Sequence, residues 1–308
     1  MLEVNLFGAG AARFYDRPMD GFPGHQSYQL FCYLLLNRDH VQNRERLASI
    51  FWGNYATHAS RKYLRNALWK LRSIFQSVGG EMDDYVQVGD ETVGFQKTSP
   101  YSLDVEAFES LLAGSRNVAG ENLNSDQAAQ LARAADLYRG DLLEGVNEEW
   151  CLYERERLSL LHLTALSKLM VYHRARRNFP AGLEYGERIL AFDHTRENIH
   201  REMMLLYWLN GEPHVALAQY KRCAQILRDQ LGVAPTVETR DLYEKMLHNQ
   251  LELPVLPCGE GDTAAAQPED GLENALQRIR HLMRIVEETN LELQQLEQQV
   301  RREQARRG

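Results

Sequence analysis

Hydrophobic positions in the first 97 residues change their period several times. Short apolar runs broken by Gly, Pro and Asp fill residues 2–24 and predict two or three short strands. Apolar residues at helical spacing then predict a first helix over residues 26–37. A second helix is expected over residues 44–53, with Asn43 as its N-cap and Gly53 as its end.

A third, longer helix is predicted to run to Phe75, with Thr57 or Ser60 as its cap. At about 100° per residue, its apolar residues gather on one side. They are Leu64, Ala67, Leu68, Leu71 and Phe75. Residues 84–95 then read as two short strands around a Gly89-Asp90 turn, which predicts a β-hairpin. Strands, three helices and a hairpin in this order indicate a winged helix of the kind that binds DNA.

Composition and charge narrow the function. The 308 residues are 44% hydrophobic and 25% charged, as in an ordinary globular protein. No apolar run approaches the roughly 20 residues of a membrane helix, and the four cysteines form no CxxC pair. A membrane protein, a secreted disulfide scaffold and a zinc finger are therefore not expected, and we predict a cytoplasmic protein. The net charge is −8, but residues 57–75 contain five basic residues and no acidic one.

The polar side of the third helix is the candidate DNA-binding surface. Long cations reach guanine edges or phosphates, and Asn pairs with adenine. We predict base-edge contacts from Lys62, Arg65, Asn66 and Lys70, and backbone contacts from Arg61, Trp69 and Arg72. The alternative is that this side of the helix is charged only because it faces solvent, without binding DNA. The place of this helix in a winged-helix pattern favours DNA. The acidic hairpin turn would repel phosphate, so we expect little binding from it.

Residues 98–253 carry an almost entirely helical pattern. Two segments resemble each other at a spacing of 34 residues, so that Gly182 corresponds to Ala216 and Ile189 to Cys223. Small residues followed by bulkier ones at this period are typical of tetratricopeptide repeats. The sequence therefore predicts an all-α repeat domain.

A basic cluster of Arg174, Arg176 and Arg177 has two interpretations. It could form an anion pocket for a phosphate-bearing effector such as a nucleotide second messenger. The favoured alternative is a solvated helix end, where cations offset the helix dipole. No P-loop, GxSxG or HExxH motif occurs, so we expect no enzyme, no catalytic residues, no metal site and no cofactor.

The last segment has a different pattern. Residues 254–270 are rich in Pro, Gly and acid without periodicity, which predicts a flexible linker. Residues 271–308 follow heptad spacing, with Asn290 at an a position, and predict a coiled-coil helix. We expect this helix to form a homodimer. The alternatives are that it packs on its own repeat domain or builds a larger bundle.

Several blocks resemble one known family. Arg46-Leu47, Phe51-Trp52-Gly53 and Lys70-Leu71-Arg72 are similar to the OmpR/PhoB-type winged helix of SARP-like activators. Residues 102–112, 137–146, 200–227 and 231–247 resemble the bacterial transcriptional activator domain that follows it. The resemblance covers about residues 1–250 in the family's order.

The resemblance for residues 1–250 and the residue pattern beyond them together predict a mainly α protein in four parts. These are a winged helix (1–97), a tetratricopeptide-like activator domain (98–253), a linker (254–270) and a coiled coil (271–308). The implied function is sequence-specific binding of double-stranded DNA and activation of transcription through contact with RNA polymerase. The competing hypothesis is a protein-interaction adaptor that uses the winged helix only for docking. An adaptor, however, has no reason to keep residues 61–72 free of acid.

Overall fold

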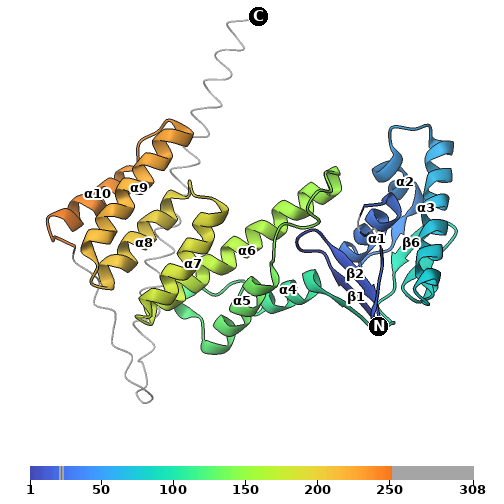
Figure 1. The fold of residues 1–308 in the computed structure, drawn as a ribbon, viewed down its shortest axis with the longest axis horizontal. Helices are drawn as coiled ribbons and strands as arrows, with labels where there is room; N and C mark the ends of the chain where they lie inside the picture. The colour runs from blue at the N-terminus through green and yellow to red at the C-terminus, as the bar shows by residue number, and fades with distance from the viewer. Residues whose placement is uncertain (21, 23, 252–308) are drawn as a thin grey trace, which may run out of the picture. The chain divides into compact units, whose positions relative to one another are not determined.

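The computed structural model describes residues 1–20, 22 and 24–251. These residues belong to one compact unit. The part of the chain so described is mainly helical, with small sheets near the N-terminus (Figure 1). The predicted linker and coiled coil lie outside the described residues, as does the homodimer expected from them.

The N-terminal module contains the first six strands and three helices. The helices are α1 (Gln26–Leu36), α2 (Arg44–Trp52) and α3 (Thr57–Ser77). The strands are β1 (Leu2–Asn5), β2 (Ala11–Phe14), β3 (Arg17–Pro18), β4 (Gln42–Asn43), β5 (Val86–Val88) and β6 (Thr92–Phe95). The predicted strands, helices and hairpin are thus all present. Strands β5 and β6 pair antiparallel as the hairpin, and β4 joins them in the order β4-β6-β5.

Helix α2 starts and stops where the sequence predicts, whereas α3 is capped differently. The Asn43 side chain accepts the N–H of Glu45, and Gly53 is the C-cap of α2. Neither Thr57 nor Ser60 caps α3, because the N-cap residue is Ala56. The Ser60 hydroxyl instead donates to the Trp52 carbonyl at 2.8 Å. The expected cap therefore fastens α3 to the end of α2.

A seventh strand corrects the expectation of a helical pattern directly after Pro100. Strand β7 (Tyr101–Leu103) pairs parallel with β1 and completes a sheet in the order β3-β2-β1-β7. Helix α4 (Asp104–Ala113) begins at the next residue. The Asp104 carboxylate accepts the backbone N–H groups of Leu6 and Phe7 at 2.9 Å. The start of the helical region is therefore hydrogen-bonded to the first strand.

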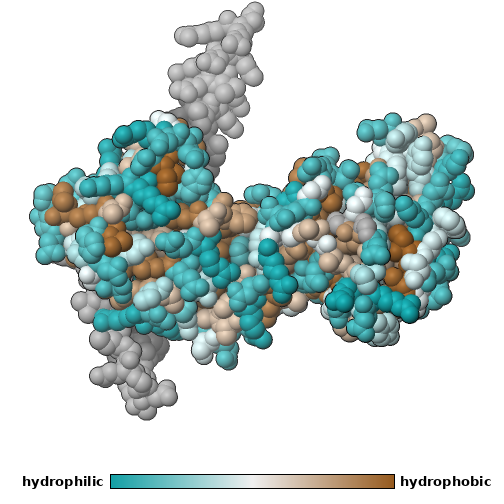
Figure 2. All heavy atoms as spheres, in the orientation of Figure 1, coloured by the Kyte–Doolittle hydropathy of each residue, from teal (hydrophilic) through white to brown (hydrophobic). Residues whose placement is uncertain are grey.

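The helical region continues from α4 as a row of packed helices. They are α5 (Ser125–Leu137), α6 (Glu149–Ala175), α7 (Phe179–Phe192), α8 (Glu197–Leu209), α9 (Pro213–Leu231) and α10 (Val237–Leu247). The close approach of α6, α7 and α8 depends on glycine. A Cβ atom at Gly186 would lie 2.9 Å from Met203 and 3.0 Å from Met170. Hydrophobic side chains gather over α8 and α10 on the face drawn in Figure 2.

His162 is a buried neutral base within α6. Its ring stacks on Tyr138, with the ring centroids 4.2 Å apart. Burial, with a smaller contribution from the Arg188 charge, lowers the pKa of His162 to about 4. Between pH 6.5 and pH 4 the unfolded chain therefore binds the extra proton, and the free energy of unfolding falls as the pH falls.

We expect the protein to lose about 2 kcal/mol of stability between pH 7 and pH 5 through His162. His162→Phe keeps an aromatic ring against Tyr138 but cannot be protonated, so it should lack this loss. Urea unfolding of both proteins at the two pH values measures the difference. If both proteins lost the same free energy of unfolding between pH 7 and pH 5, His162 would not be the source of the loss.

Candidate nucleic-acid interface

Helix α3 presents one buried and one exposed side, as its sequence predicts. The five apolar residues of the predicted stripe are buried against the rest of the module. All seven predicted DNA-contacting side chains lie on exposed residues. Trp69 is the extreme case, with 71% of its surface exposed. In Figure 1, α3 lies along the outer edge of the N-terminal module. A straight helix with a free polar side has the shape that fits a major groove.

The cations of α3 divide into paired and unpaired groups. Arg61 forms an ion pair with Glu45 at the start of α2, and Arg72 forms one with Asp83. Among the described residues, Lys62, Arg65 and Lys70 have no carboxylate within ion-pair distance. These three side chains are therefore available to an external anion without first breaking an internal contact.

A hollow of about 710 Å³ adjoins the N-terminal half of α3. Arg61 and Arg65 line it from α3, while Asp90 and Glu91 line it from the hairpin turn. The Arg44 guanidinium donates to the Gly89 carbonyl at 3.0 Å, which ties the hairpin to α2. A phosphate entering here would meet three carboxylates, those of Asp90, Glu91 and Glu45. Sequence reasoning missed Glu45, which reaches Arg61 only because α2 and α3 fold together.

A second hollow, of about 440 Å³, lies beside the middle of α3. Asn66 and Lys70 line it together with Tyr63, His25 and Ser27. Helix α1 begins here at Gln26, and its N-cap residue makes no side-chain capping bond. A helix start carries partial positive charge and favours an anion. Nothing in the local sequence pattern signals that α1 begins next to α3.

The three arginines of the suggested anion pocket do not converge. The Arg174 guanidinium lies 2.8 Å from a carboxylate oxygen of Glu202. Arg176 lies over the Tyr172 ring at 3.8 Å and donates to the Leu123 carbonyl at 2.6 Å. Two of the three are thus engaged in packing the helical region. Both guanidinium groups bind groups of the protein itself, which is neither an open anion pocket nor a solvated helix end.

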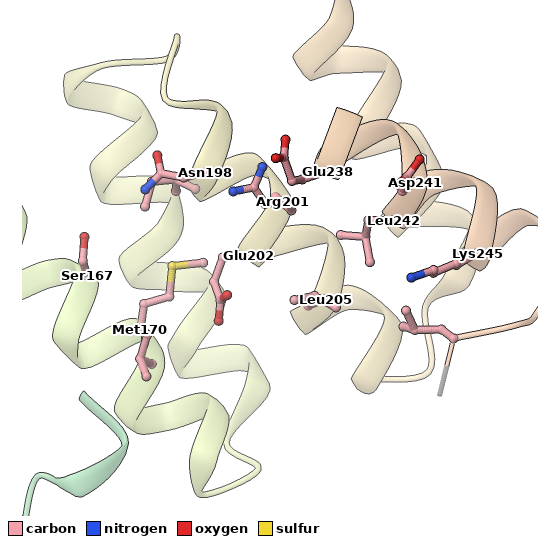
Figure 3. Close-up of a pocket in the computed structure, with 13 residues that line it drawn as sticks. Ser167, Met170, Asn198, Arg201, Glu202, Leu205, Glu238, Asp241, Leu242 and Lys245 are labelled. Atoms are coloured by element: carbon pink, nitrogen blue, oxygen red, sulfur yellow. The ribbon is translucent and has the colours of Figure 1, made fainter. Parts of the chain in front are cut away.

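The sequence did not indicate a cleft of about 590 Å³ between α6, α8 and α10 (Figure 3). Met170, Leu205 and Leu242 give it an apolar lining. Arg201 and Glu238 lie near each other at its edge. Burial raises the pKa of Glu202, which the Arg174 charge partly offsets. Opposite charges are therefore mixed around the cleft, and no single ligand chemistry stands out.

Metal-binding clusters and membrane-spanning helices are both absent from residues 1–20, 22 and 24–251. Nowhere in these residues do three His, Cys, Asp or Glu side chains lie close enough together to hold a metal ion. No helix within them combines the length and the apolar composition needed to cross a membrane.

Comparisons with known proteins define the class. The family model of the bacterial transcriptional activator domain matches residues 103–247. A solved structure of Mycobacterium tuberculosis EmbR in complex with a low-affinity phosphopeptide matches with a TM-score of 0.66 at 18% identity. That match covers 82% of this chain and 66% of the EmbR chain, and it shows a shared fold.

Two curated relatives extend the match toward the N-terminus. Regulatory protein AfsR of Streptomyces coelicolor is 23% identical over 243 residues, which are 78% of this chain and 24% of AfsR. Transcriptional regulatory protein MoaR1 of M. tuberculosis is 23% identical over 249 residues, which are 80% of this chain and 76% of MoaR1. The chain thus spans about a quarter of AfsR. Residues 103–247 of the chain match the bacterial transcriptional activator domain, and the chain as a whole is similar to the SARP-like regulators that carry this domain.

Proposed function

We propose that this protein is a sequence-specific DNA-binding regulator of transcription whose residues 1–97 form an OmpR/PhoB-type winged helix. Helix α3 is the recognition helix, and the β5–β6 hairpin is the wing. One observation carries the proposal: three unpaired cations stand on the exposed side of a helix whose other side is buried. The similarity of the chain to the regulatory proteins AfsR and MoaR1 supports it.

The side chains divide by role. Lys62, Arg65, Asn66 and Lys70 read base edges in the major groove. Trp69 packs against the sugar-phosphate backbone. Arg61 and Arg72 bind phosphates of the DNA backbone. Because each must first give up its ion pair, with Glu45 and Asp83 respectively, each contributes less to the binding free energy than a cation that has no ion-pair partner among the described residues. The start of α1 adds a further phosphate contact.

The helical region positions the winged helix and recruits RNA polymerase, so that the protein acts as a cytoplasmic activator. Its helices α6 to α9 serve as tetratricopeptide-like repeats. Arg174 and Arg176 stabilise this region rather than hold an effector. An adaptor that only docks proteins would gain nothing from leaving Lys62, Arg65 and Lys70 unpaired.

The salt dependence of binding to duplex DNA tests this function. Five basic side chains on one helix should release counterions, so log K should fall with log salt with a slope of about −3 or steeper between about 50 and 200 mM. Fluorescence anisotropy with the full chain gives this slope. An absence of binding at the lowest salt would reject the proposal.

A further inference from the structure

A groove of about 720 Å³ lies between α2 and the N-terminal end of α6. Aromatic side chains form much of its lining, from Tyr33 and Phe51 on one wall to Trp150 and Tyr153 on the other. Tyr153 has 75% of its surface exposed, and the neighbouring Leu152 has 46%. An exposed aromatic and leucine beside a formed groove are unusual on a free surface and indicate a contact with another molecule.

The rim of this groove is acidic. Glu148, Glu149 and Glu154 line it, against one arginine, Arg46. Glu154 is paired with Arg157 at 2.8 Å, whereas Glu148 and Glu149 have no cation within ion-pair distance among the described residues. Arg46 has no carboxylate within ion-pair distance among these residues either, so the unpaired charge at the rim is negative by one unit. It disfavours nucleic acid as the occupant and suits a cationic one.

The two walls of the groove are fixed to each other. The Trp150 ring packs edge-to-face on Tyr33 at 5.6 Å and lies 5.8 Å from the Phe51 ring. Glu109 of α4 binds Arg38 at 2.9 Å and Arg157 at 2.7 Å, which links the end of α1 to α6. A preformed groove avoids the entropy cost of ordering its walls when a partner binds.

The groove is separate from the proposed DNA surface. It is lined from α2 by Arg46, Ser49 and Ile50, and none of its lining residues belongs to α3. The two hollows beside α3 share no lining residue with it. An occupant of the groove and a DNA duplex on α3 therefore use different side chains.

We propose that this groove docks a basic amphipathic segment of a partner protein. An aliphatic or aromatic side chain of that segment would pack on Trp150 and Tyr153, and its Lys or Arg residues would pair with Glu148 and Glu149. The partner class rests on the proposed function: at a promoter, such a segment belongs to RNA polymerase. The groove is then the place where a DNA-bound regulator receives the polymerase.

The first test measures docking without DNA. The probe is a fluorescent helical peptide built only from leucine and lysine in a seven-residue repeat. We expect the double variant Glu148→Lys/Glu149→Lys of the full chain to bind it about tenfold more weakly than the original protein. The matched control Glu184→Lys/Asp229→Lys makes the same charge change on exposed residues of α7 and α9 and should bind within about twofold.

A second variant tests the groove without changing the charges at the start of α6, where two lysines could disturb the fold. Tyr153→Ala removes an exposed ring without changing charge and should weaken peptide binding several-fold. Thermal unfolding of each variant checks the fold. Equal peptide affinities for the groove variant, Tyr153→Ala and the control would overturn the docking proposal.

The third measurement adds RNA polymerase holoenzyme to the protein on a DNA fragment that it binds. The groove variant should bind this DNA as the charge-matched control does, yet form the ternary complex about tenfold less well. Equal ternary complexes would overturn the proposal. If neither variant nor the original protein bound any DNA, the proposed function would fail, and the peptide experiment would still decide the groove.

Discussion

Replacing Arg65 and Lys70 together by alanine is expected to abolish specific DNA binding while leaving the fold intact. Both side chains are exposed, and neither has an ion-pair partner among the described residues. A good base contact contributes about 1–3 kcal/mol, so the pair should lower the affinity for the operator by a factor between roughly 30 and roughly 20,000. Fluorescence anisotropy with the operator duplex measures this loss.

The stability of this double variant should change by less than about 0.5 kcal/mol per site, because exposed helical positions tolerate alanine. Arg133→Ala/Lys221→Ala is the matched control, since it removes two exposed cations from α5 and α9. It should reduce DNA binding only slightly, by its effect on net charge. If the α3 variant kept the affinity of this control, helix α3 would not be the recognition helix.

Asp104→Ala should give the largest loss of stability, about 3 kcal/mol. The Asp104 carboxylate accepts the N–H of Leu6 through both oxygens at 2.9 Å, and the N–H of Phe7 at 2.9 Å. Leu6 is fully buried and Phe7 nearly so, so alanine would leave these donors without an acceptor. Urea unfolding of the full chain measures the change in the free energy of unfolding.

Asp104→Asn separates hydrogen bonding from charge. The amide keeps one acceptor oxygen with nearly the same shape, so this variant should lose clearly less stability than Asp104→Ala. The alanine variant should also loosen the pairing of β1 with β7, because β7 ends at Leu103, next to Asp104. A loss below about 1 kcal/mol in Asp104→Ala would show that the carboxylate does not hold the two elements together.

Features set by local sequence were predictable here. The Asn43 cap, the Gly53 end of α2 and the buried stripe of α3 each depend on residues within one or two turns. The β5–β6 hairpin likewise depends on a short turn between two apolar runs. The exposure of Lys62, Arg65 and Lys70 was predictable for the same reason. Once the apolar stripe of α3 is buried, the residues on the opposite side of the helix must face outward.

Features that depend on distant pairing were not predictable. Strand β7 has only three residues, and its partner β1 lies about 100 residues earlier. Glu45 reaches Arg61 through the packing of α2 on α3. The acidic groove combines Arg46 with Glu148 and Glu149, and no period along the chain encodes that proximity. A single sequence gives the faces of helices but not which faces meet.

Selection of binding fragments from a genomic DNA library, with the purified full chain at two salt concentrations, tests the central claim most directly. A recognition helix predicts that sequencing of the bound fragments yields one shared motif. It also predicts that the recovery of fragments falls steeply at the higher salt. Bound fragments that share no motif at either concentration would contradict a sequence-specific regulator.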